Sequence, residues 1–412
     1  MIFRLGKVID RDDPSIREGD RQNFWDKNLR MNSSLLSNQR LFSINLGSHV
    51  GFSFSSPTFE ATLMLAEPQI LMIDDLQFYD NFRVVLLAKN PISYPAQSPE
   101  PGICYGVNGN NLPSKKETID IFKSNGITKI RIYFPDAEAL EALRGSNIEL
   151  TADVAKESLQ AISSDPNAAK DWVNTNIVPY SQDVRFKYIT LGNEIHPGDV
   201  EAQYILSGMQ NIHNALASSN LGQIKVSTAI DLSLLGNSYP PSDGAFSEAA
   251  TAYMQQIVNF LVPNGSPLLA NIYSYFAYAS DQVNIPLEYA LFTQQGNNAV
   301  GYQNLFDAML DSTYAALEKI GANNLQIVVS ESGWPSSGGV GASIQNGGAY
   351  YQNLINHVKS GTGTPKRPNQ PIETYLFAMW DENLKPGAET ERHFGLLHAD
   401  KSRKYELHFH GN

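Results

Sequence analysis

The chain has 412 residues, of which 42% are hydrophobic, 17% are charged and one is a cysteine. This composition provides enough apolar residues for a large core, and a formal net charge of −12 argues against a nucleic-acid partner, which needs a basic face. The single cysteine, Cys104, excludes an intrachain disulfide and a cysteine-ligated zinc site.

The first hundred residues differ in character from the rest. The N-terminus is charged almost at once, so we expect no secretory signal peptide there, and no run approaches the ~20 apolar residues of a membrane span. Residues 61–90 contain short apolar runs that fit either strands or a helix, and residues 90–102 contain four prolines. We therefore predict a loosely ordered, poorly defined N-terminal extension with a Pro-rich lead-in over residues 1–101, and a main domain over residues 102–412.

From residue 102 onward, apolar runs typical of strands alternate with segments of helical pattern. The predicted strands cover residues 102–108, 129–135, 148–154, 186–194, 224–231, 268–276, 325–332 and 372–383. The predicted helices cover residues 112–126, 136–146, 165–180, 201–219, 247–265, 302–321 and 346–361. Two of these helices have clear boundary signals, because Pro113 and Gly126 flank the first, and Asp165 with Pro166 opens the third.

Strict alternation of strands and helices favours a parallel sheet with crossover helices. Eight such units in about 300 residues favour a closed (β/α)8 TIM barrel, an α/β fold, over an open sheet. No G-x-G-x-x-G motif follows the first strand, so a dinucleotide site has no support. The histidines do not form a ligand cluster by their spacing, and we expect neither a metal nor a cofactor.

Catalytic groups of such barrels lie at the carboxyl ends of the strands. Two of the predicted strands have a glutamate as their last or next-to-last residue, followed by a Gly- and Pro-containing loop, namely Glu194 in "TLGNEIHPG" and Glu331 in "VVSESGWPSSGG". Strict alternation places Glu331 on the same face as Val329, which points into the barrel mouth. Two carboxylates across a cleft are what glycoside hydrolysis needs. Aromatic residues at neighbouring strand ends, among them Tyr273, Phe276 and Trp334, are predicted to contact sugars.

The segments "ICYGVNGNNLPS", "RIYFPD", "TLGNEI", "LLANIYSYFAYA", "VVSESGWPSSGG" and "AMWDENLKPGAETERHFGLL" resemble plant β-1,3-glucanases of glycoside hydrolase family 17 over residues 102–407. The resemblance implies endo attack on β-1,3-glucan by a retaining mechanism, with Glu194 as the acid/base and Glu331 as the nucleophile. It places supporting roles on Glu382, Lys385 and Tyr133. It also implies secretion to the apoplast or delivery to the vacuole, which the charged N-terminus does not predict.

Three further residues have two interpretations each. Asn193 would point away from the mouth under strict alternation, but a bulge could bring it inward beside Glu194, so it either binds substrate or has a structural role. Lys385 either supports catalysis or forms a structural ion pair with Glu382. Arg131 shares a face with Tyr133 and either orients the nucleophile or neutralises a buried carboxylate.

Two alternatives to a β-1,3-glucanase remain at this point, a mixed-linkage β-1,3-1,4-glucan hydrolase and a β-glucan-binding protein without turnover. The presence of Glu194, Glu331, Glu382 and Lys385 favours an enzyme. The expected partner is a β-1,3-glucan polysaccharide, with no nucleic acid and no membrane, and the expected oligomeric state is a monomer.

Overall fold

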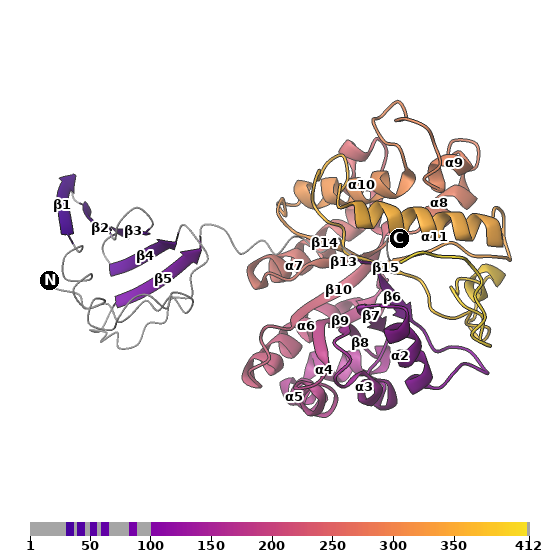
Figure 1. Ribbon diagram of the computed structural model, residues 1–412, viewed down its shortest axis with the longest axis horizontal. Coiled ribbons are helices and arrows are strands. Elements are labelled where there is room, and N and C mark those ends of the chain that lie inside the picture. The colour runs from indigo at the N-terminus through magenta and orange to yellow at the C-terminus, as the bar shows by residue number, and fades with distance from the viewer. Residues whose placement is uncertain are drawn as a thin grey trace, which may run out of the picture. The chain divides into compact units, whose positions relative to one another are not determined.

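The computed structural model describes residues 100–409 in full and, before them, the backbone of five strands (Figure 1). The chain divides into two units, Met1–Gln97 and Ser98–Asn412, and each is described by itself. The first unit has one sheet in the order β1 (Arg30–Leu36), β2 (Gln39–Asn45), β3 (Val50–Ser55), β4 (Phe59–Leu65) and β5 (Phe82–Ala88). The strands pair antiparallel except for β4 and β5, which are parallel. The apolar runs at both ends of residues 61–90 are therefore strands and not a helix, while the Pro-rich lead-in up to residue 99 lies outside the described residues.

Within residues 100–409, eight parallel strands close into a barrel, which confirms the predicted (β/α)8 fold. The strands are β6 (Gly102–Tyr105), β7 (Lys129–Ile132), β8 (Glu149–Val154), β9 (Arg185–Asn193), β10 (Lys225–Asp231), β13 (Leu268–Asn271), β14 (Ile327–Ser332) and β15 (Thr374–Leu376). A small antiparallel pair, β11 (Leu235–Asn237) and β12 (Ala245–Phe246), lies in the segment between β10 and α7.

Helices surround the barrel strands (Figure 1). They are α2 (Lys115–Ser124), α3 (Ala137–Leu143), α4 (Leu159–Ser164), α5 (Pro166–Asn176), α6 (Ala202–Ser218), α7 (Glu248–Asn264), α8 (Ser274–Ser280), α9 (Leu287–Ala290), α10 (Leu305–Lys319) and α11 (Ile344–Ser360). The described part of the chain contains no helix of the length and apolarity that a membrane crossing requires.

The predicted helix starts correspond to real caps. The side chain of Ser114 accepts from the backbone N–H of Glu117, and the Glu117 carboxylate accepts from the backbone N–H of Ser114, which completes a capping box for α2. The side chain of Asp165 caps α5, with Pro166 at the first helical position. Pro166 also separates α5 from the short α4, a helix that the sequence pattern missed.

Several predicted strands extend past their observed carboxyl ends, and two of them do so by five residues or more. The strand predicted over 268–276 ends at Asn271, and Tyr275 and Phe276 lie in α8, because aromatic packing in the fold overrides their β-propensity. The strand predicted over 372–383 ends at Leu376. Beyond it the backbone pairs with other loops, since Ala378 N–H donates to the carbonyl of Phe394 and Leu396 N–H donates to that of Ala378. Both corrections place a loop or helix, rather than a strand, at the barrel mouth.

Candidate active site

A cavity of about 400 Å³ opens at the carboxyl ends of the barrel strands. Its walls come from the carboxyl ends of β6, β7, β9 and β14 and from segments that follow the barrel strands, including β13 and β15. The lining residues are Tyr105, Gly106, Val107, Asn108, Lys115, Ile132, Tyr133, Phe134, Asp136, Ala139, Asn193, Glu194, Tyr273, Phe276, Glu331, Phe377, Glu382, Lys385, Glu391 and Phe394. Eight of the nine site residues predicted from the sequence lie here, and Trp334 does not.

A β-bulge brings Asn193 and Glu194 to the cavity together. Thr190 of β9 pairs with Ser227 of β10, but the next pair is Asn193 with Ala229, so β9 has one residue more than β10 between the two pairs. Gly192 makes this possible with φ of +76°, and a Cβ at this position would lie 2.6 Å from Ile205. The bulge considered from the sequence is confirmed.

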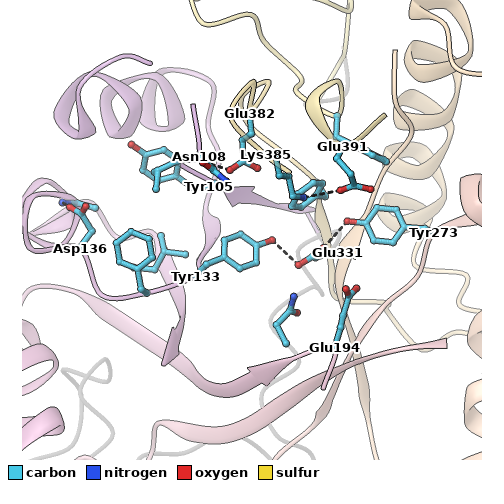
Figure 2. Close-up of a pocket in the computed structure, with 18 of the residues that line it drawn as sticks. Tyr105, Asn108, Tyr133, Asp136, Glu194, Tyr273, Glu331, Glu382, Lys385 and Glu391 are labelled. Atoms are coloured by element: carbon cyan, nitrogen blue, oxygen red, sulfur yellow. Dashed lines mark hydrogen bonds and ion pairs between the residues drawn. The ribbon is translucent and has the colours of Figure 1, made fainter. Parts of the chain in front are cut away.

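Glu331 is held by three donors. It is 5% exposed, and a register shift against β13 places it directly beside Asn271. The hydroxyl of Tyr133 donates to Oε1 at 2.7 Å, and the hydroxyl of Tyr273 donates to Oε2 at 2.6 Å. Figure 2 shows the two tyrosines approaching the carboxylate from opposite sides. Burial raises the pKa of both phenols well above the usual value, so both remain protonated donors.

The third donor is Arg131, whose side chain is completely buried beneath the cavity. Its Nη1 donates to Glu331 Oε1 at 3.0 Å, and its Nη2 donates to Asp153 Oδ2 at 2.7 Å and to Asn193 Oδ1 at 2.9 Å. Both interpretations of Arg131 therefore hold, because it orients Glu331 and also neutralises the buried Asp153. A guanidinium with carboxylates on both sides has little freedom to move.

Glu194 has a different environment. Its side-chain oxygen Oε1 accepts one hydrogen bond, from Nδ2 of Asn271 at 2.9 Å. Burial, together with the charge of Glu331, raises the pKa of Glu194 to about 7, although the Asn271 hydrogen bond and Arg131 act in the opposite direction. The two glutamates thus differ in the hydrogen bonds they accept, three for Glu331 and one for Glu194.

Glu382, Lys385 and Glu391 form the wall contributed by the loop after β15. Glu382 accepts from the backbone N–H of Asn108 at 2.9 Å, and burial raises its pKa. A Cβ at Gly106 would lie 2.4 Å from the Glu382 carboxyl group, so a larger residue there would displace that carboxyl group. Lys385 Nζ lies 3.1 Å from Glu391 Oε2 and 4.4 Å from the centre of the Phe377 ring. The ion pair considered between Lys385 and Glu382 is therefore replaced by one with Glu391 (Figure 2).

The aromatic residues predicted to contact sugars occupy three kinds of position. Phe276 is 43% exposed and lines the cavity, as does Phe134, which is 39% exposed. Tyr273 lines the cavity as well, with its hydroxyl bound to Glu331. The prediction for Trp334 is wrong, because its side chain is 0% exposed. Its indole packs against Tyr275 and donates to the Gly341 carbonyl at 2.9 Å, so it supports the loop after β14.

Sequence reasoning did not single out Asn271, Asp153, Phe134 or Glu391 as site residues. Asn271 and Asp153 had an available signal, because each is a polar residue near the end of an apolar strand, like Glu194. Glu391 lies in a loop, and neither a sequence motif nor a hydrophobic periodicity there predicts its contact with Lys385. Among the described residues, no group of three or more His, Cys, Asp or Glu side chains is arranged to hold a metal ion.

Two carboxylates in such different surroundings, facing one cavity at the mouth of a (β/α)8 barrel, place this chain among the glycoside hydrolases. The family model described as Glycosyl hydrolases family 17 matches residues 102–409. The chain therefore belongs to glycoside hydrolase family 17, and the resemblance seen in the sequence is confirmed.

Individual relatives agree with this assignment. The chain is 54% identical over 316 residues to a glucan endo-1,3-beta-glucosidase of Vitis vinifera, covering 75% of this chain and 91% of that protein. Among solved structures, CJP38, a beta-1,3-glucanase and allergen of Cryptomeria japonica pollen, matches with a TM-score of 0.73 at 44% identity, over 76% of this chain and 100% of that one. A structure from a study of two plant beta-glucan endohydrolases with distinct substrate specificities matches with a TM-score of 0.71 at 41% identity, over 74% of this chain and 99% of that one.

Proposed function

We propose that this chain is an endo-acting β-1,3-glucan hydrolase that retains anomeric configuration, with Glu331 as nucleophile and Glu194 as general acid/base. One observation carries the assignment of roles. Glu331 accepts from three donors, which suits a carboxylate that must remain ionised and fixed in place. Glu194 accepts from a single amide and has a pKa raised to about 7, which suits an acid that keeps its proton near neutral pH.

The first chemical step forms a covalent intermediate. An oxygen of Glu331 attacks the anomeric carbon, the bond from that carbon to the glycosidic oxygen breaks, and the proton of Glu194 goes to the departing oxygen. The hydrogen bonds from Tyr133, Tyr273 and Arg131 hold the Glu331 carboxylate in one orientation for this attack.

The second step releases the sugar. Glu194, now a carboxylate, removes a proton from a water molecule, whose oxygen attacks the anomeric carbon. The ester bond to Glu331 breaks, and the starting protonation of both glutamates returns. A pKa near 7 serves both halves of this cycle, because Glu194 must give up a proton in one step and accept one in the next.

Supporting roles are proposed for residues around the pair. Asn193, beside Glu194 on the bulge, contacts substrate hydroxyls, while Phe276 offers an exposed ring on which a sugar face can stack. Glu382 and Lys385 line the same cavity and bind sugar hydroxyls on the side opposite Glu194 (Figure 2). Tyr273, with its hydroxyl engaged by Glu331, acts on the nucleophile more than on the sugar.

The substrate assignment is tested with purified full-length chain on a linear β-1,3-glucan and on a mixed-linkage β-1,3-1,4-glucan side by side. We expect faster release of reducing ends from the β-1,3-glucan, with solution viscosity falling before many reducing ends appear. Release of glucose alone from the first minutes would contradict endo attack. Faster hydrolysis of the mixed-linkage polymer would favour that alternative, and binding without release would favour a glucan-binding protein.

The roles of the glutamates are tested by azide rescue with a dinitrophenyl β-glucoside. For Glu331→Ala, we expect no turnover of glucan and formation of the α-glycosyl azide, because azide replaces the nucleophile. For Glu194→Ala, we expect turnover of the activated substrate and the β-glycosyl azide, because azide attacks the intermediate. The opposite anomers would reverse the two assignments.

Two further expectations accompany this proposal. Secretion to the apoplast or vacuolar delivery, implied by the family resemblance, is checked by fractionating tissue that expresses the full chain. A monomeric state is checked by size-exclusion chromatography with light scattering, where a mass near 45.5 kDa is expected and twice that mass would contradict it.

A further inference from the structure

The amide of Asn271 lies between the two glutamates. Asn271 is the last residue of β13, is 2% exposed and is the register partner of Glu331 on β14. Its Nδ2 donates to Glu194 Oε1 at 2.9 Å and to Asn193 Oδ1 at 3.0 Å. Its Oδ1 accepts from Ser330 Oγ at 2.7 Å and from Arg131 Nη1 at 3.3 Å. All four of these contacts are within the protein, so the amide is fully engaged.

The chemistry of the partners fixes which way this amide faces. Arg131 has only donors, so an oxygen and not an NH₂ group must face it. The NH₂ group of Asn271 is then forced toward Glu194. Because both amide hydrogens are in use and neither can accept, Glu194 Oε1 cannot hold a proton that points at Asn271. Among the described residues, Oε2 of Glu194 accepts no hydrogen bond from the protein, and it is the oxygen left to bind the proton.

We infer that Asn271 is a positioning residue that keeps Oε1 of Glu194 an acceptor and so directs the acid proton to Oε2. The inference rests on the proposed function of Glu194 as general acid/base. The role of Asn271 goes beyond what the two glutamates provide by themselves, because without this hydrogen bond the proton of Glu194 could lie on either carboxyl oxygen. A proton held on one oxygen is delivered to the glycosidic oxygen from one fixed direction.

Asn271 also joins the two glutamates through hydrogen bonds. Nη1 of Arg131 donates both to Glu331 Oε1 and to Asn271 Oδ1, and Asn271 donates on to Glu194. The same bond to Glu194 lowers the pKa of that acid, against the larger effects of burial and of the Glu331 charge, which raise it. Removal of the Asn271 donor should therefore make Glu194 a weaker acid.

The test is Asn271→Asp in the full chain, because an aspartate keeps the shape and can still accept from Arg131 and Ser330 while its second oxygen lacks the amide hydrogens. We expect kcat/KM on β-1,3-glucan to fall about tenfold or more, since this substrate needs the acid. We expect kcat/KM on a dinitrophenyl β-laminaribioside to stay within about threefold, because its leaving group needs no proton. The basic limb of the kcat/KM profile on glucan should move to higher pH.

Two more variants separate this role from a merely structural one. Asn271→Ala removes the donor without adding a charge and should also move the basic limb to higher pH. Asn211→Asp is the matched control, since the Asn211 amide donates to the carbonyls of Ile162 and Ser163 on the outer helices. It should leave both the profile and the ratio of the two substrates unchanged. Equal losses on both substrates with an unmoved basic limb in both Asn271 variants would overturn the inference. Wild-type chain that fails to hydrolyse glucan would instead refute the proposed function.

Discussion

Glu194→Gln is expected to stabilise the folded chain at alkaline pH, although it removes the proposed acid. Burial and the charge of Glu331 raise the folded-state pKa of Glu194 to about 7, compared with an ordinary value of 4.5. Between these two pH values the folded state binds more protons than the unfolded state, so stability falls as pH rises. Above pH 7 the partly buried carboxylate is ionised, and the loss in the free energy of unfolding reaches its full size. Glutamine resembles the protonated acid and does not ionise, so it avoids this loss.

The size of the expected gain in stability follows from the raised pKa of Glu194. A difference of 2.5 pH units between 7 and 4.5 corresponds to about 3 kcal/mol at 1.36 kcal/mol per unit. For a domain of about 310 residues this is a rise in Tm of about 5 °C. The gain should be present at pH 8, shrink between pH 7 and 4.5, and be absent at pH 4.

The assay is urea or thermal unfolding followed by tryptophan fluorescence for wild type and Glu194→Gln between pH 4 and 8. Glu288→Gln is the control, because Glu288 is exposed and does not line the cavity, so its replacement should not reproduce the gain in stability at pH 8. In a Glu331→Gln background the gain should shrink, since the charge of Glu331 is the second cause of the raised pKa. A Glu194→Gln chain that is less stable than wild type at pH 8, or equally stable at all pH values, would refute the burial argument.

Three further outcomes are expected. The wild-type kcat/KM on β-1,3-glucan should decline as pH rises through about 7, where Glu194 loses its proton, and a basic limb below pH 5 would contradict this assignment. Trp334→Phe should lower Tm and leave KM unchanged, because the indole is fully buried. Phe276→Ala should raise KM with little change in Tm, because its ring is exposed. Thermal melts and initial rates that give the reverse pattern would contradict both expectations. A chain that begins at Pro101 should hydrolyse glucan like the full chain, because all cavity-lining residues lie between Tyr105 and Phe394, and an inactive or insoluble product would contradict this.

The barrel and its glutamates could be predicted from the sequence because both depend on local pattern. Apolar runs at regular spacing predict the strands, and a carboxylate that ends such a run marks the carboxyl edge of the sheet. Arg131 lies on β7 and Tyr133 directly follows that strand, and alternation correctly placed the two residues on one face, where both donate to Glu331.

Other features of the site arise from contacts between segments that are distant in sequence. The indole of Trp334 is buried by Tyr275 and Tyr350, and neither contact has a local signature. A tryptophan next to a Gly/Ser loop therefore has the same sequence pattern whether it faces a sugar or the core. Likewise, Lys385 has acidic residues on both sides in sequence, and only the fold of its loop selects Glu391 over Glu382.

The bulge in β9 explains how adjacent residues both serve one cavity. Strict alternation would turn Asn193 and Glu194 to opposite faces, so one of them would be lost to the site. The extra residue removes this conflict, and positive φ angles at Gly192 and Glu194 are part of the change in direction. A glycine inside a strand pattern is a recognised sign of such a bulge. Gly192 was therefore the one local clue to the geometry.

The two glutamates are the same amino acid, and their difference comes from what the neighbouring strands present to them. β7 gives Glu331 a guanidinium, and the segments directly after β7 and β13 give it two phenols, so its charge faces three donors. Glu194 receives one amide hydrogen, and burial beside a charged partner then favours its neutral form. A second donor aimed at Glu194 would favour its ionised form, and less of it would carry the proton that general-acid catalysis needs. The scarcity of donors around Glu194 is therefore as much a part of the proposed mechanism as their abundance around Glu331, and the instability it causes above pH 7 is its consequence.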